Sequence, residues 1–253
     1  MASTVVATSL KTWSRREEFS KVVGPGKDSE MVFGGFGRDA LAFYAGLEAD
    51  NSKTYWNLNK PVYESAVGEP MKAFATSVAE EFGTLVVFRP HRDVRFAKDK
   101  SPYKTHTGAV TELEGGAMVY IQLSSKGLMA ASGYYMMASD QLERFRASVA
   151  DDKTGPALEA AIAAVRAAKL HVSHGGSEPL KTAPRGYPKD HPRIALLRWK
   201  GVIGSKDFGA PSWLHTKACI GHVEKAWRDT RPIRAWLDRH VGPSMLMPEE
   251  EAR

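Results

Sequence analysis

The chain has 253 residues and a net charge of +6, and it is 43% hydrophobic and 25% charged. These values are ordinary for a globular protein with a sizeable core. Its single cysteine, Cys219, excludes an internal disulfide and a cysteine-based zinc site and fits a reducing compartment. No apolar run is long enough for a transmembrane helix, and no basic region precedes the short apolar run at residues 5–10, as a signal peptide requires. We therefore expect a soluble cytoplasmic protein with no membrane partner.

The domain organisation is predicted from shifts in composition. Residues 1–30 mix Ser, Thr, Lys and Glu and end in a stretch containing Gly and Pro, which indicates a mobile N-terminal extension. Met31 then opens a compact pattern and is a candidate alternative start. A single domain is predicted over residues 31–241, followed by a C-terminal tail at 242–253.

Hydrophobic periodicity predicts helices first, then adjacent strands, then helices again. The predicted helices cover residues 38–49, 50–63, 71–82, 139–149, 157–170, 211–228 and 232–241. The predicted strands cover residues 88–97, 117–123, 128–137 and 194–203. Asp50 or Asn51 is the expected cap of the second helix, Glu143 completes a capping box with Asp140, and residues 171–192 are expected to form a long loop. This order favours an α+β fold, in which a mainly antiparallel sheet is flanked by N-terminal and C-terminal helices.

Residues 88–106 concentrate the basic charge of the chain, with six Arg and Lys against two acids. Up to Ala97 the stretch alternates between an apolar side and a cationic side, which is typical of a strand. Arg92 falls on the apolar side, so a carboxylate or a bound anion must satisfy its guanidinium. Residues 98–104 follow as a predicted turn, in which Pro102 removes one hydrogen-bond donor.

The run Arg-Asp-Val-Arg-Phe-Ala-Lys-Asp-Lys-Ser-Pro-Tyr-Lys at 92–104 resembles the hallmark of a family known as domain of unknown function 2461, with Ala97 in place of a Ser. Two further stretches are similar to motifs of that family. The first runs from Asn51 through Tyr55, Trp56 and Lys60 to Tyr63, and the second contains 184–187, 191–192 and 198–200. The resemblance covers about residues 31–240, leaves residues 1–30 outside, and implies no assigned activity or cofactor.

Our main hypothesis is an oxyanion site for a phosphorylated or carboxylated small molecule, because Arg offers a planar fork and Lys a mobile charge. The predicted ligand-binding residues are Arg89, Arg92, Asp93, Arg95, Lys98, Lys100, Tyr103, Lys104, Arg198 and Lys200. The first alternative is a structural ion-pair network of Arg92, Asp93, Asp99 and Arg198 in a non-enzymatic scaffold. The second is a nucleic-acid-binding module, which the interleaved Phe88, Phe96 and Tyr103 would suit. The excess of cations over acids favours the ligand site, and acids elsewhere favour a confined pocket over an extended groove.

Catalytic and metal chemistry find little support in the sequence. His91 and Asp93 have the right types for acid–base work, but on one strand they lie about 6.5–7 Å apart, too far for a direct pair. Neither His171 with His174 nor His215 with His222 has a metal-ligand spacing, and no Gly-x-Ser-x-Gly elbow or phosphate-binding Walker loop is present. We therefore predict no metal and no cofactor, and the sequence does not decide whether the protein is an enzyme.

Overall fold

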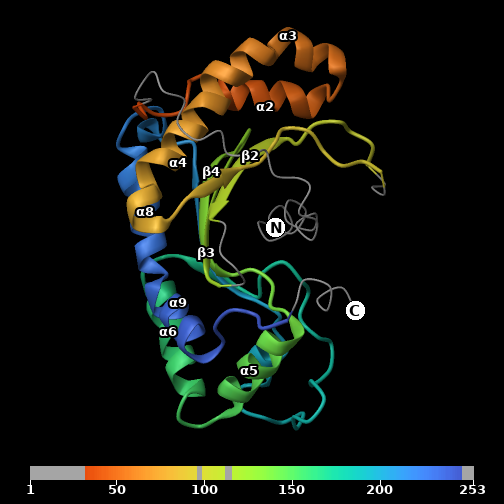
Figure 1. Ribbon diagram of the computed structural model, residues 1–253, viewed down its shortest axis with the longest axis vertical. Helices are drawn as coiled ribbons and strands as arrows, with labels where there is room; N and C mark the ends of the chain where they lie inside the picture. The colour runs from red at the N-terminus through yellow and green to blue at the C-terminus, as the bar shows by residue number, and fades with distance from the viewer. Residues whose placement is uncertain (1–31, 96–98, 112–115, 247–253) are drawn as a thin grey trace.

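The computed structural model describes residues 32–95, 99–111 and 116–246 (Figure 1). The predicted extension at 1–30, Lys98 of the predicted site and residues 247–253 of the predicted tail lie outside this range. At the centre is an antiparallel sheet with the strand order β1-β2-β3-β4-β6-β5. Its strands are β1 (Leu85–Val87), β2 (His106–Thr111), β3 (Met118–Ser124), β4 (Gly127–Tyr134), β5 (His171–Ser173) and β6 (Val202–Gly209). The α+β class predicted from the sequence is confirmed.

Strands β2, β3 and β4 form a meander whose side chains alternate between two apolar faces. Ile121 and Leu123 belong to the core beneath the helices, whereas Met118 and Tyr120 belong to a cluster on the opposite face. The turn between β3 and β4 needs Gly127, because its φ is +108° and a Cβ there would lie 1.9 Å from a carbonyl oxygen of β6. The predicted strands at 117–123 and 128–137 are confirmed to within a few residues at each end.

Three N-terminal helices were predicted and all three form. They are α2 (Ala40–Ala49), α3 (Lys53–Tyr63) and α4 (Glu69–Phe82). A π-helix, η1 (Glu64–Gly68), joins α3 to α4 directly after Pro61, whose ring and missing N–H disturb the regular helical hydrogen bonds. The predicted cap of α3 at Asp50 or Asn51 is wrong, because the Ser52 hydroxyl accepts the Tyr55 N–H at 3.1 Å. Asn51 has a different role, described below.

The C-terminal half departs further from expectation. Its helices are α5 (Ser139–Ala150), α6 (Gly155–Ala167), α7 (Ile194–Leu197), the 3₁₀ turn η2 (Ser212–His215), α8 (Cys219–Asp229) and α9 (Arg231–His240). The strand predicted at 194–203 is wrong: α7 occupies its first half, and β6 begins only at Val202. The long loop predicted at 171–192 contains β5. The predicted Asp140–Glu143 capping box is also wrong, because Gln141 Oε1 accepts the Ala138 N–H at 2.9 Å.

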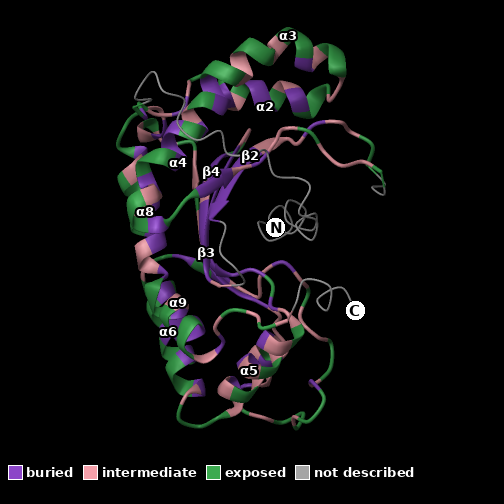
Figure 2. Ribbon diagram, viewed as in Figure 1, coloured by how far each residue is buried: buried purple, intermediate pink, exposed green. Residues whose placement is uncertain are grey.

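Different helices lie at the two ends of the molecule. In Figure 1, α4, α8, α9 and α6 line one side of the sheet, while α2 and α3 lie at one end of the molecule and α5 at the other. Figure 2 shows that burial is concentrated in the sheet and in the inward sides of these helices. Trp227 of α8 is fully buried and donates its indole N–H to Tyr120 O at 3.1 Å, which ties the helical layer to β3.

Candidate basic site

The basic stretch forms an irregular two-stranded arm that connects β1 to β2. We define the arm as residues 88–95 and 99–106. Its two sides are joined by hydrogen bonds from Arg92 N to Pro102 O at 2.9 Å and from Lys104 N to Pro90 O at 2.8 Å. The long strand predicted at 88–97 is wrong over its described residues 88–95, since β1 ends at Val87 and an isolated bridge joins His91 to Tyr103 further along the arm. Prolines on both sides of the arm donate no N–H, so a continuous ladder cannot form.

The base of the arm is anchored to the start of α3. The side-chain amide of Asn51 donates to Tyr103 O at 3.1 Å and accepts from Tyr103 N at 3.0 Å, so it satisfies both backbone groups of that residue. The buried Tyr103 ring stacks on Trp56 with a centroid distance of 4.4 Å and an angle of 9° between the planes. The His91 ring lies 5.2 Å from the Tyr103 ring. Two stretches that resemble family motifs therefore meet here, and Tyr103, predicted as a ligand contact, packs in this anchor.

Both acids of the arm form ion pairs within it. Arg92 pairs with Asp99, so a carboxylate satisfies this guanidinium, which was one of the two partners expected from the sequence. Hydrogen bonds from the Ser101 hydroxyl and N–H, together with Arg92, lower the pKa of Asp99 to about 2. Asp93 accepts from Arg95 Nη2 at 2.7 Å and from the Arg95 N–H at 3.1 Å. These two pairs match part of the structural network considered as an alternative, and each lies within a short segment of the arm.

Five basic groups gather towards the base of the arm. This basic cluster consists of Arg89, His91, Arg92, Lys104 and His106. Burial, helped by Arg89 and Lys104, lowers the pKa of His91, and burial together with Lys104 and Arg92 lowers the pKa of His106 to about 4. Lys104 Nζ lies 5.3 Å from the centroid of the Phe88 ring. The smaller contribution to both shifts comes from repulsion by neighbouring cations, and a bound anion would offset that repulsion.

Lys100 and Arg95 lie further out on the arm. Lys100 Nζ donates to Val94 O at 2.9 Å, which folds the side chain back onto its own loop. Arg95 has an exposed side chain, with 61% of its surface accessible. Of the predicted ligand residues, these two are therefore placed outside the basic cluster.

Arg198 and Lys200 do not join the arm. They precede β6, whose first residue pairs with Tyr134, whereas the arm continues from the end of the sheet where β4 begins at Gly127. Because strands rise about 3.3 Å per residue, the length of β4 separates these two ends by roughly 23 Å. The backbone carbonyls of Arg198 and Lys200 accept from Leu180 N at 2.9 Å and Met137 N at 3.0 Å. The described residues of the predicted site therefore form two separate groups.

The neighbouring Arg193 was not predicted as important, yet it fixes this second region. It is buried, and its guanidinium donates to Val149 O at 2.6 Å and to Ala150 O at 2.9 Å. These are carbonyls at the end of α5, where no further helical N–H is available. Arg193 also pairs with the exposed Asp152 at 2.6 Å. In the sequence, Arg193 follows residues 191–192, which resemble a family motif, and this position could have indicated that it is important. Only the fold shows which carbonyls its guanidinium caps.

The remaining chemical candidates have structural positions. Cys219 is buried, and burial raises its thiol pKa to about 12. His222 stacks on Trp213 at 4.1 Å, and His215 Nδ1 lies 3.1 Å from Phe36 O. No group of three or more His, Cys, Asp or Glu side chains in the described ranges is arranged to hold a metal ion. No helix in the described part of the chain is both long and apolar enough to cross a bilayer.

Fold and site together define an α+β protein whose antiparallel sheet carries an anchored basic arm at one end. A family model described as a conserved hypothetical protein, domain of unknown function 2461, matches residues 39–236, and the chain belongs to this family. The match includes both motif stretches that meet at Tyr103 and also Arg193. Comparison with curated proteins and with solved structures found no match.

Proposed function

We propose that the protein binds a small phosphorylated or carboxylated molecule at the basic cluster of the arm. The observation that carries this proposal is the gathering of basic groups at the base of the arm, where Arg89 and Lys104 act on His91, and Lys104 and Arg92 act on His106. An oxyanion placed among these groups would offset their mutual repulsion and accept charge-assisted hydrogen bonds. Arg supplies a planar fork for such a ligand, while Lys supplies a point charge that adapts to its position.

The anchoring of the arm supports a ligand site on rigid elements. The Asn51 clamp and the Trp56 stack fix Tyr103, and the ladder hydrogen bond of Lys104 N to Pro90 O fixes the next residue. Cations that are already positioned lose less conformational entropy when a ligand binds. The ion pair of Arg92 with Asp99 also holds one guanidinium near the site.

Binding at this cluster should be linked to proton uptake. Because His91 and His106 have lowered pKa values in the free protein, a bound anion favours their charged forms and raises these values. Affinity for an anion should therefore increase as the pH falls from 7.5 towards 5. An anion held by Lys and Arg alone would show no such dependence beyond its own titration.

The test is isothermal titration of the full chain with inorganic phosphate, citrate and sulfate at pH 5.5 and 7.5. Sulfate keeps its charge over this range, so we expect it to bind more tightly at the lower pH, and we expect all three anions to bind more weakly to Lys104→Gln. The matched control is Lys126→Gln, which removes an exposed lysine from the β3–β4 turn. A ligand at 100 times its Kd should also raise the free energy of unfolding by about 2.7 kcal/mol.

The alternatives give different results in the same experiment. Binding of a short oligonucleotide that weakens steeply with salt, without binding of phosphate or citrate, would refute the small-molecule site in favour of a nucleic-acid module. Equal weakening in Lys104→Gln and Lys126→Gln would refute the assignment to the arm. If no probe binds, the ion pairs of the arm have a purely structural role and the proposal fails.

A further inference from the structure

An open pocket of about 650 Å³ lies at the other end of the sheet from the arm. Tyr134 at the end of β4 forms one wall, Arg231, Arg234 and Asp238 of α9 form another, and Gly242 with Pro243 forms a third. The volume falls within the range of pockets that bind small molecules. No residue of this pocket belongs to the site predicted from the sequence.

The pocket contains a guanidinium that is incompletely satisfied. Arg234 Nε is buried and has no hydrogen-bond partner within the described ranges. A buried donor without an acceptor costs free energy, and that cost is larger for a charged group. Arg231 differs, because it is exposed and pairs with Glu81 at 3.0 Å. Arg234 is therefore the group that an oxyanion in the pocket would satisfy, through Nε and a neighbouring Nη.

Asp238 restricts the kind of ligand that fits beside Arg234. It accepts a hydrogen bond from the Tyr134 hydroxyl at 3.1 Å, and its second oxygen remains a potential acceptor. Arg228 and Arg231 form one ion-pair network with Glu81 and Glu224, in which two positive charges balance two negative charges, so Arg234 and Asp238 leave the pocket close to charge balance. Such a site disfavours a polyanion and favours a molecule that has both an anionic end and a hydrogen-bond donor.

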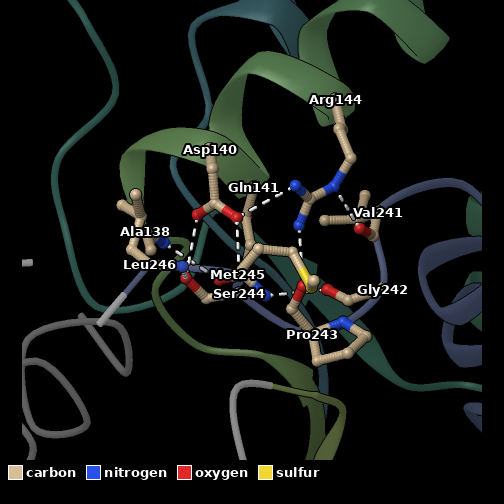
Figure 3. Close-up of polar contacts among 10 residues, drawn as sticks. All are labelled: Ala138, Asp140, Gln141, Arg144, Val241, Gly242, Pro243, Ser244, Met245 and Leu246. Carbon is tan, nitrogen blue, oxygen red and sulfur yellow. Dashed lines mark hydrogen bonds and ion pairs between the residues drawn. The ribbon is translucent and has the colours of Figure 1, made fainter. Parts of the chain in front are cut away.

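The third wall is held in place by the start of α5, as Figure 3 shows. Arg144 donates to Val241 O at 2.6 Å and to Pro243 O at 2.8 Å, and Gln141 donates to Gly242 O at 2.8 Å. Asp140 accepts from the Met245 N–H at 2.8 Å and the Ser244 hydroxyl at 2.9 Å. Residues 242–246, the beginning of the predicted tail, are thus fixed to α5 and give the pocket a defined backbone wall.

We propose that this pocket is a second ligand site, distinct from the arm, for a small molecule that carries one carboxylate or phosphate together with a hydroxyl group. Arg234 binds the oxyanion through its guanidinium fork. Asp238 accepts a hydrogen bond from the hydroxyl group. The proposal does not depend on the function proposed for the arm, because the two sites share no residue.

The experiment is isothermal titration of the full chain with glycerol 3-phosphate and with lactate, which separate a phosphate from a carboxylate ligand. We expect one of them to bind and Arg234→Gln to weaken that binding at least tenfold. Arg239→Gln is the matched control, since it removes an exposed arginine from the same helix outside the pocket. Both probes also belong to the ligand class proposed for the arm, so the titrations are carried out in the Lys104→Gln background, where the binding that remains belongs to the pocket.

Asp238→Asn gives a second readout that a merely destabilised variant would not produce. Removing the negative charge beside Arg234 should strengthen the binding of inorganic phosphate measured in the Lys104→Gln background. It should strengthen glycerol 3-phosphate binding less, because Asn is a weaker acceptor for its hydroxyl. No binding of either probe, or equal losses in Arg234→Gln and Arg239→Gln, would overturn the proposal.

Discussion

The clamp between Asn51 and Tyr103 gives the sharpest prediction about stability. Replacing Asn51 by Ala removes two hydrogen bonds, of 3.0 and 3.1 Å, and leaves the backbone N–H and C=O of a buried residue without partners. At about 1 kcal/mol for each bond, the expected loss is about 2 kcal/mol of unfolding free energy. Asn51 lies outside α3, so a change in helix propensity does not enter this value.

The assay is urea unfolding monitored by tryptophan fluorescence, to which Trp56 in the Tyr103 stack contributes together with the other five tryptophans of the chain. The control is Asn59→Ala, which removes one side-chain bond to Tyr55 O within the same helix and should change stability by under about 0.5 kcal/mol. For a chain of this size the Asn51 variant should melt about 4–8 °C lower. Equal stability of the two variants would refute the view that the clamp anchors the arm.

Two other predictions concern a buried arginine and a titrating histidine. Arg193→Met should lower the free energy of unfolding in urea by about 2–4 kcal/mol, because the carbonyls at the end of α5 lose their donor. Asp152→Ala should lower it by under about 1 kcal/mol, because the Asp152 side chain is exposed. Equal losses would show that the ion pair, not the cap, matters. The pKa of His106 is lowered to about 4, so between about pH 6.5 and 4 the unfolded chain binds a proton that the folded protein does not. The free energy of unfolding should therefore decrease as the pH is lowered across this window, by up to about 3 kcal/mol. A His106→Gln variant with an unchanged pH profile of stability would contradict this assignment.

The parts of the fold that could be predicted are those with strong local patterns. The helix predicted at 71–82 forms as α4 with Phe74 and Val78 buried, and the strand predicted at 117–123 forms as β3. The prediction of a strand at 194–203 was wrong because a short alternation of apolar residues is compatible with either a strand or a helical turn. Contacts with distant α5 decide between them, as when Arg146 donates to Leu197 O at 3.3 Å.

For the candidate site, the sequence located the basic stretch but not its arrangement. Arg92 was expected to need a carboxylate or a bound anion, and Asp99, seven residues away and a member of the alternative ion-pair network, supplies the carboxylate. The anchor of Tyr103 comes from Asn51, 52 residues earlier, and no local pattern indicates such a partner. Arg198 was grouped with the arm in the predicted oxyanion site, but the topology of the sheet separates them.

The strand order also has a consequence for the folding pathway. Strands β1 to β4 pair with their sequence neighbours, so they can form through contacts of short sequence separation. The pairing of β4 with β6 must close a loop that holds α5, α6, β5 and α7, and that loop contributes to a hydrophobic cluster of its own. Closing it costs chain entropy before the β6 ladder forms. We therefore expect the β1–β4 meander and α4 to form the folding nucleus. We expect β6 to pair with β4 later, when the second hydrophobic cluster has partly formed.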